Sequence, residues 1–230
     1  MLRERKDYPR LITPAAPSIW PALNEPDYKF KKDTGEYHAR LRISPDDLPA
    51  WQPVVDAAQA ILDEAFEAKK AELTREKKGA LLKELNKAEA IIKPEIDPET
   101  GDETGFYIFR ASMNARVDIK NGPRAGQSFD KKPDIFNAKG QSLKNPPKIG
   151  GGSELKLGVV PMDYWMAKDK TVGVRFELEG AQILKLIQGG ARTADFYGFT
   201  AEDGDDIEDG DEPVKTGGFA DESGDDGGDF

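Results

Sequence analysis

Apolar and polar residues alternate with a period of two in four stretches of the chain, a pattern that predicts strands with one buried face. The stretches are Glu36–Ser44, Phe106–Val117, Glu154–Val160 and Val172–Leu186. The side chains expected to face the core are Tyr37, Ala39, Leu41, Ile43, Tyr107, Phe109, Ala111, Met113, Ala115, Val117, Leu155, Leu157, Val159, Val172, Val174, Phe176 and Leu178. Gly180 interrupts the last stretch and predicts a bulge or bend.

Two further stretches, Leu11–Trp20 and Ser128–Phe136, carry weaker strand signals. Their prolines favour positions at the edges of a sheet, because proline cannot donate a hydrogen bond to a neighbouring strand.

A helical block separates the first two of the strong strand stretches. Apolar residues recur at helical spacing from Val54 to Ile91, Gly79 interrupts them, and Pro94 follows. This predicts a helical insertion over about residues 47–93, made of one long helix or two. Because strands, helix and strands follow one another without βαβ alternation, we predict a mainly β fold, an OB-fold antiparallel barrel with an inserted helix.

The formal net charge of −10 averages two unlike segments. Residues 201–230 hold 13 acidic residues and one lysine, whereas residues 104–200 carry 15 basic against 9 acidic residues. A segment so acidic and so poor in apolar residues is predicted to be disordered. We therefore expect an OB-fold domain over 1–197 and a disordered acidic tail over 198–230.

Several kinds of chemistry are disfavoured by composition. The chain has no cysteine and a single histidine, His38, which alternation places on an exposed strand face. The glycine run at Ile149–Lys156 lacks the Gly-Lys-Ser/Thr of a phosphate-binding loop and leads into a strand. We expect no enzymatic activity, no cofactor and no metal. With neither a long apolar run nor a secretory signal, we expect no membrane contact and a cytoplasmic location.

Basic and aromatic side chains on the outer strand faces and in loops favour binding of single-stranded DNA, through phosphate contacts and base stacking. The residues predicted to bind DNA are Arg40, Arg42, Phe106, Arg110, Arg116, Lys120, Lys131, Lys132, Tyr164, Trp165, Lys168 and Lys170. The run Lys29–Lys32 adds further loop residues. No recognition helix or zinc finger is evident, so we expect binding that depends weakly on base sequence.

The acidic tail ends on an aromatic residue, Phe230, directly after Asp229. Its carboxylates are expected to compete with DNA phosphates for the basic groove, and Phe230 to occupy a base-stacking pocket. The alternative for the tail is that it only confers solubility. The alternative for the whole protein is an acidic-tailed chaperone or DNA mimic that binds basic partners.

These features resemble the single-stranded DNA-binding proteins of T7-type bacteriophages. The resemblance rests on GEYHARLRI with the helix that follows, on FRASM, on IGGGSELKL, on TVGVRFELEGAQILKL and on the terminal DGGDF. It implies an OB-fold protein that coats single-stranded DNA in phage replication, recombination and repair, in the host cytoplasm. It also implies a tail that contacts DNA polymerase and helicase–primase, with Asp225, Asp226, Asp229 and Phe230 as the tail's binding residues. A homodimer is compatible with the sequence.

Overall fold

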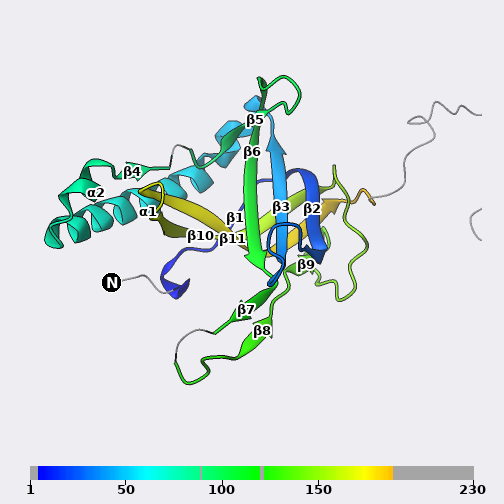
Figure 1. Ribbon diagram of the computed structural model, residues 1–230. Coiled ribbons are helices and arrows are strands. Elements are labelled where there is room, and N and C mark those ends of the chain that lie inside the picture. Colours follow the sequence, from blue (N-terminus) through cyan, green and yellow to red (C-terminus); the bar gives the residue numbers. More distant parts are fainter. Residues whose placement is uncertain (1–4, 89, 120–121, 189–230) are drawn as a thin grey trace, which may run out of the picture. The chain divides into compact units, whose positions relative to one another are not determined.

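Five long strands pair in a closed ring in the computed structural model (Figure 1). They are β2 (Ala16–Asp27), β3 (Glu36–Ile43), β6 (Glu103–Asn114), β11 (Thr171–Lys185) and β10 (Glu154–Met166). In this order each strand pairs with the next, and β10 closes the ring on β2 through Leu155 opposite Ala16. All these pairings are antiparallel except that between β6 and β11. This is the strand order of the OB-fold barrel, as predicted.

The structure describes residues 5–88, 90–119 and 122–188. The chain divides into two units, residues 1–191 and 192–230. The predicted tail, with Asp225, Asp226, Asp229 and Phe230, lies outside the described residues, and so does Lys120.

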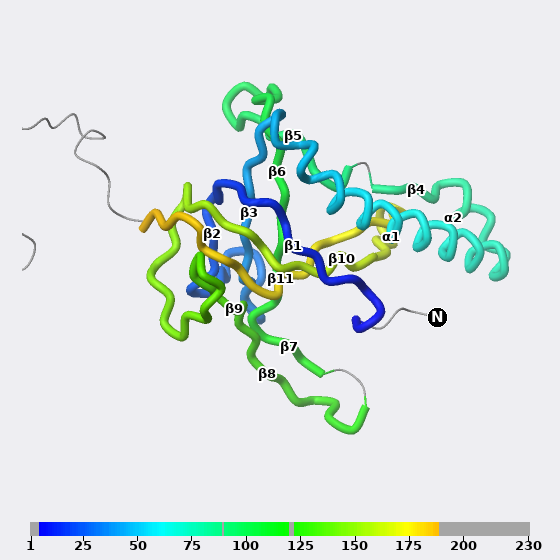
Figure 2. The backbone as a smooth tube through the Cα atoms, turned by 180° about the vertical axis from the view of Figure 1, so that it is seen from behind, coloured from blue at the N-terminus to red at the C-terminus, as the bar shows by residue number. Residues whose placement is uncertain are grey.

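Shorter elements decorate the barrel. They are η1 (Arg5–Asp7), β1 (Leu11–Ile12), η2 (Pro45–Asp47), α1 (Leu48–Arg75), α2 (Gly79–Lys83), β4 (Asn86–Lys87), β5 (Lys93–Ile96), β7 (Arg116–Asp118), β8 (Ser128–Asp130) and β9 (Asp134–Phe136). Strands β7 and β8 form a separate two-stranded hairpin, which extends from the end of β6 in both views (Figures 1 and 2).

The alternation of apolar residues fills the barrel as predicted, except that Val117 lies in β7, outside the ring, and is partly exposed because the chain leaves the barrel after β6. Ala39, Leu41 and Ile43 of β3 are fully buried and face Phe109 and Ala111 of β6 inside the ring. Because successive residues of a strand point to opposite faces, the residues between them project outward.

The predicted bulge at Gly180 is confirmed. Gly158 pairs with Gly180, but Val159 pairs with Leu178, so Glu179 is an extra residue in β11. The extra residue switches the buried positions from Leu178 to Ala181, which keeps both halves of the strand packed on the core. Gly180 also allows β9 to approach, since a Cβ there would lie 2.6 Å from the carbonyl oxygen of Asp134.

Helix α1 covers the end of the barrel through one apolar face. Trp51, Val54 and Ala58 are buried in the main core, and the Trp51 ring lies 5.0 Å from that of Phe109. Phe109 in turn lies 4.5 Å from Phe176 of β11, so one cluster of tilted aromatic rings joins the helix to two strands of the ring.

The helical insertion is shorter than predicted. α1 ends at Arg75, where Lys77 adopts φ 55° and the amide of Lys78 donates back to the carbonyl of Leu73. Gly79 begins the short α2, and residues 86–96 contain strands β4 and β5 instead of helix. The prediction was wrong there because the spacing of Ala88 and Ile91 is compatible with a helix, whereas strand pairing to β11 and β6 decides the structure.

The edge position predicted for Leu11–Trp20 is wrong for β2, which pairs with both β10 and β3. Its prolines are tolerated because the start of the strand pairs with β10 and the remainder with β3. The ladder with β3 is also irregular between Ile19 and Ala22, around Pro21. The second weak stretch, Ser128–Phe136, divides into β8 and β9, with Pro133 between them.

Candidate nucleic-acid interface

The outer faces of β2, β3 and β6 form a continuous surface because these strands are neighbours in the ring (Figure 1). The register places Arg40 directly opposite Arg110 on one side and Ile19 on the other. Arg42 lies opposite Ile108, which also faces Lys93 of β5. We call this surface the barrel face; it unites the predicted residues Arg40, Arg42, Phe106 and Arg110.

Arg110 is held on the barrel face by Glu36, contrary to the exposed position expected for this carboxylate. Glu36 is buried; Arg110 Nη2 donates to its Oε2 at 2.7 Å and Lys31 Nζ to its Oε1 at 2.6 Å. Burial alone would raise the pKa of Glu36, but the bonds from Lys31 and Ser112 and the charge of Arg110 lower it. One carboxylate thus pairs with two cations, and about half of the Arg110 side chain remains exposed.

Arg42 and Phe106 lie together at the other end of the barrel face. The Arg42 guanidinium lies 3.8 Å from the centroid of the Phe106 ring, a cation–π contact. Glu95 accepts two hydrogen bonds from Arg42, at 2.7 and 2.9 Å. One face of the predicted stacking ring is therefore covered by a predicted phosphate ligand, and that ligand is already paired.

Arg40 differs from these two arginines. It is exposed, and within the described part of the chain it makes no ion pair. Its position between Arg110 and Ile19 is fixed by the strand ladder rather than by a salt bridge. Among the arginines of the barrel face, Arg40 is thus the one most open to a phosphate.

The loop between β2 and β3 adds exposed aromatic and basic groups beside Glu36. Phe30 is 84% exposed and Tyr28 54%, and the Lys29 ammonium lies 5.4 Å from the centroid of the Phe30 ring. Gly35, at φ 64°, lets the Tyr28 ring lie against the backbone, since a Cβ there would lie 2.9 Å from the ring. In OB-folds this loop and the face of the second and third strands are the usual nucleic-acid contacts.

His38 lies in the floor of the barrel face, opposite Ser112 and Ala22. The prediction of a surface histidine was wrong, since its side chain is only 14% exposed. Burial lowers the pKa of His38 despite Asp27, whose Oδ2 lies 3.5 Å from Nε2. A neutral imidazole therefore lies beneath the arginines and adds no charge to them at neutral pH.

Three more predicted residues lie around the β7–β8 hairpin. Arg116 is exposed and contacts Asp118 at 3.4 Å. Lys131 is paired with the half-buried Glu177 at 2.6 Å, and hydrogen bonding by Lys131 helps to lower the pKa of that carboxyl against the effect of burial. Lys132 is exposed. Lys131 is thus largely occupied by an internal contact, whereas Arg116 and Lys132 project at the base of the hairpin.

The structure places the remaining predicted residues elsewhere, at the tip of the β10–β11 hairpin. Tyr164 and Trp165 line a groove of about 610 Å³ against α1, and Lys69 lies 4.8 Å from the centroid of the Trp165 ring. Lys170 pairs with Glu84 at 2.6 Å, while Lys168 is exposed in the turn. This tip lies beyond the point where β11 pairs with β6, at Phe176 and Glu177, so these four residues are not part of the barrel face.

Four residues near the barrel face were not among the predicted DNA ligands. Trp20 is 81% exposed and follows Ile19; Tyr28 lies in the adjoining loop; Lys93 lies beyond Ile108; and Arg175 precedes Phe176, which pairs with Ala111. The sequence signal for Trp20 was the Ile-Trp-Pro run, which breaks the alternation and so predicts a bulge. Lys93 was not predicted to bind DNA because it was assigned to the helical insertion.

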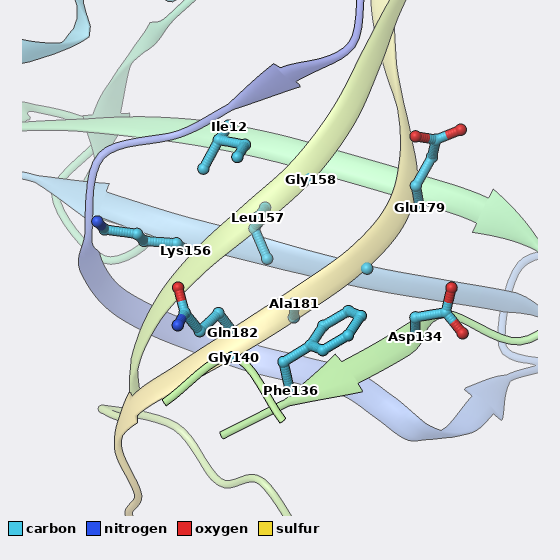
Figure 3. Close-up of a pocket in the computed structure, with 11 residues that line it drawn as sticks. Ile12, Asp134, Phe136, Gly140, Lys156, Leu157, Gly158, Glu179, Ala181 and Gln182 are labelled. Carbon is cyan, nitrogen blue, oxygen red and sulfur yellow. The ribbon is translucent and has the colours of Figure 1, made fainter. Parts of the chain in front are cut away.

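A second hollow, of about 350 Å³, lies over β10 and β11 and contains none of the predicted ligands. Its floor includes Leu157, Gly158 and Ala181, and Ile12 lies across it from Phe136 (Figure 3). Within the described residues no cluster of acidic or histidine side chains could hold a metal ion, and no helix is long and apolar enough to span a membrane.

A five-stranded OB barrel with arginines on its second and third strands, and with exposed aromatic rings on its first strand and in the loop that follows, has the features of OB-folds that bind single-stranded nucleic acid. The family model for the single-stranded DNA-binding protein of bacteriophage T7 matches residues 14–186, about three quarters of the chain. The chain belongs to this family.

Solved structures show the same fold at low sequence identity. The crystal structure of gp2.5, a single-stranded DNA-binding protein encoded by bacteriophage T7, is 20% identical, with a TM-score of 0.63; the match covers 87% of this chain and all of gp2.5. A C-terminally truncated single-stranded DNA-binding protein from bacteriophage Enc34 is 12% identical, with a TM-score of 0.51 over 78% of this chain and 87% of that one. No curated protein sequence matches the chain.

Proposed function

We propose that this protein binds single-stranded DNA along the barrel face, without reading its base sequence, and coats it during phage DNA replication, recombination and repair in the host cytoplasm. Phosphates are bound by Arg40, Arg42 and Arg110, and bases stack on rings such as Phe106 and Phe30. Such contacts recognise the charge and the flat bases that every single strand presents. The protein acts by binding and does not catalyse a reaction.

The observation that carries this proposal is the row formed by Ile19, Arg40 and Arg110 on three neighbouring strands. Strands in a sheet lie about 4.8 Å apart, so the two arginines place their charges within the reach of neighbouring phosphates of one extended strand. Lys93 and the Lys29–Lys32 loop extend the positive charge to either side.

The acidic tail acts as a competitor and a docking arm. Its 13 carboxylates are on the same chain as the barrel, so they compete with DNA phosphates for the barrel face at high effective concentration. When DNA displaces the tail, Asp225, Asp226, Asp229 and Phe230 become available to DNA polymerase and helicase–primase. A homodimer would place two such tails on one assembly.

The test compares two single-charge variants of the full chain, Arg40→Ala and Lys83→Ala. Lys83 is an exposed lysine of α2, away from the barrel face, and so controls for the loss of one positive charge. Affinity for a labelled oligothymidylate is measured at several salt concentrations, with a duplex of the same length beside it. We expect Arg40→Ala to weaken binding and to make the slope of log K against log salt shallower by about 0.7, the value for one phosphate contact on a single strand.

Lys83→Ala should leave both the affinity and the slope unchanged, and the duplex should bind more weakly than the single strand. Equal effects of the two variants would show that the barrel face is not the DNA site. A wild-type chain that binds no oligonucleotide would refute the function itself.

A further inference from the structure

Trp20 is held out of the protein by a strained piece of backbone. It lies in β2 at φ 45°, in the left-handed region that a bulky residue rarely adopts, and its side chain is 81% exposed. The ladder with β3 is irregular between Ile19 and Ala22, and Ser18 and Leu23 on either side are buried. The bulge therefore turns both Ile19 and Trp20 away from the core.

Neither local conformation nor packing accounts for this arrangement. A left-handed backbone is unfavourable for tryptophan, and an exposed ring gains little from the hydrophobic effect. Strain of this kind persists where the surrounding structure enforces it, and it concentrates at binding sites. An exposed tryptophan ring in such a position offers a flat apolar face to a ligand that can stack on it.

The surroundings of Trp20 identify that ligand. Ile19, the residue before it, lies opposite Arg40, and Arg40 lies opposite Arg110, so Trp20 stands at the β2 end of the arginine row. Gly151 lies close to the backbone of Trp20: a Cβ at residue 151 would lie 3.8 Å from the Trp20 amide nitrogen. Because residue 151 is a glycine, it places no side chain against the backbone of Trp20.

A lysine, Lys148, lies in a loop that is held against β2. The side chain of Asn24 donates to the carbonyl oxygens of Pro146 and Pro147, at 3.1 and 3.0 Å, and accepts from the amide of Ile149 at 2.9 Å. Lys148 therefore has its backbone held beside β2, and it is exposed. Residues 137–153 contain three lysines and no acidic residue, so this loop carries a net positive charge.

We propose that Trp20 is a base-stacking residue, and that the single strand leaves the arginine row over Trp20 toward Lys148. This inference rests on the proposed function, since it extends the path of the DNA from β6 and β3 onto β2. A base stacks on the exposed Trp20 ring, and a neighbouring phosphate is bound by Lys148.

The experiment uses the full chain with Trp20→Ala, Trp20→Phe and Trp20→Gly, and measures affinity for oligothymidylate at fixed salt. Loss of a stacking ring weakens binding by about 5-fold to 150-fold, so we expect this from the alanine and glycine variants. The phenylalanine variant keeps a ring and should retain most of the affinity. Glycine favours a left-handed backbone, so Trp20→Gly should unfold at the wild-type temperature or higher, which separates lost binding from lost folding.

Tryptophan fluorescence gives an independent readout. The chain has three tryptophans, of which Trp51 is fully buried and cannot meet DNA. Quenching on adding oligothymidylate should fall strongly in Trp20→Phe and persist largely in Trp165→Phe. Because no charge is removed, the salt slope should stay at the wild-type value in each Trp20 variant.

Failure of the proposed role of Trp20 can be distinguished from failure of the proposed function. Wild-type affinity and undiminished quenching in Trp20→Ala and Trp20→Phe, together with weakened binding by Arg40→Ala, would overturn the role of Trp20 and leave the proposed function standing. Absence of oligothymidylate binding by the wild-type chain would overturn both. Weakening by Trp20→Ala that is not rescued by Trp20→Phe would also overturn a stacking role.

Discussion

Glu36 limits the charge that the barrel face offers to DNA, and its removal should strengthen binding. One Glu36 carboxylate pairs with both Lys31 and Arg110, at 2.6 and 2.7 Å, so the three groups together carry one positive charge. Glu36→Gln keeps the shape of the side chain and leaves both cations uncompensated. This variant should therefore bind single-stranded DNA more tightly than the wild type, although it loses two ion pairs.

The size of the effect follows from the geometry. A carboxylate about 6 Å from a bound phosphate repels it by about 0.7 kcal/mol in water, which corresponds to about threefold in affinity. One more uncompensated cation should steepen the slope of log K against log salt by about 0.7. When salt rises from 50 to 200 mM, the binding constant falls for both proteins, and the factor by which it falls should be about 2.6 times larger for the variant than for the wild type.

The assay is fluorescence anisotropy of a labelled oligothymidylate across a salt series, with Glu67→Gln as the matched control. Glu67 is an exposed carboxylate of α1 with one loose contact, to Lys70 at 3.7 Å, so this control changes the net charge equally at another place. Equal affinity gains in the two variants would refute the reasoning, because only net charge would then matter. Weaker binding by a folded Glu36→Gln protein would show that the carboxylate is needed to position Arg110.

Three other predictions concern the tail, the core and pH. Deletion of residues 201–230 should tighten binding at fixed salt, measured by the same anisotropy assay, and unchanged or weaker affinity would contradict competition by the tail. Phe109→Ala should lower the free energy of unfolding by about 3–5 kcal/mol in urea titrations, because the ring is fully buried between Trp51 and Phe176; a loss below about 1 kcal/mol would argue against the importance of this aromatic cluster. His38 has a lowered pKa when folded, so its stabilising effect is present above about pH 6.5 and is lost as the pH falls through the lowered value. Thermal unfolding of His38→Gln should depend less on pH between 6.5 and 5 than that of the wild type, and an identical dependence would exclude His38 as its source.

The alternation of residues was enough to predict four of the five barrel strands and the outward arginines, whereas β2 was predicted at an edge. A strand between two others in a closed ring must bury one face, so Leu41 and Phe109 point inward and Arg40 and Arg110 point outward whatever the rest of the chain does. The OB-fold class was predicted from four strong strands and one interrupting helix, whereas the order of the five strands in the ring is given by the structure. The bulge at Gly180 could be predicted because glycine in a strand is itself a local signal.

The parts that could not be predicted depend on contacts between distant residues. The alternation places Glu36 on the exposed face of its strand. In the structure, however, Lys31 from a loop and Arg110 from another strand donate hydrogen bonds to it, and it is buried. Trp165 is aromatic and lies near lysines in the sequence, yet packing of α1 against the hairpin places it away from the arginine row. Local patterns carry no information about either contact.

The insertion of α1 between β3 and β6 delays assembly of the proposed DNA-binding surface while the chain folds. Ile43 and Tyr107 are paired in the ladder although about 60 residues separate them in the sequence. Joining two points that far apart costs about 3.6 kcal/mol of chain entropy in a flexible loop, so the pairing forms slowly unless α1 folds first and shortens the loop. A chain emerging from the ribosome therefore carries Arg40 long before Arg110 lies beside it. The proposed binding surface at Arg40 and Arg110 is therefore assembled only when β3 and β6 have paired.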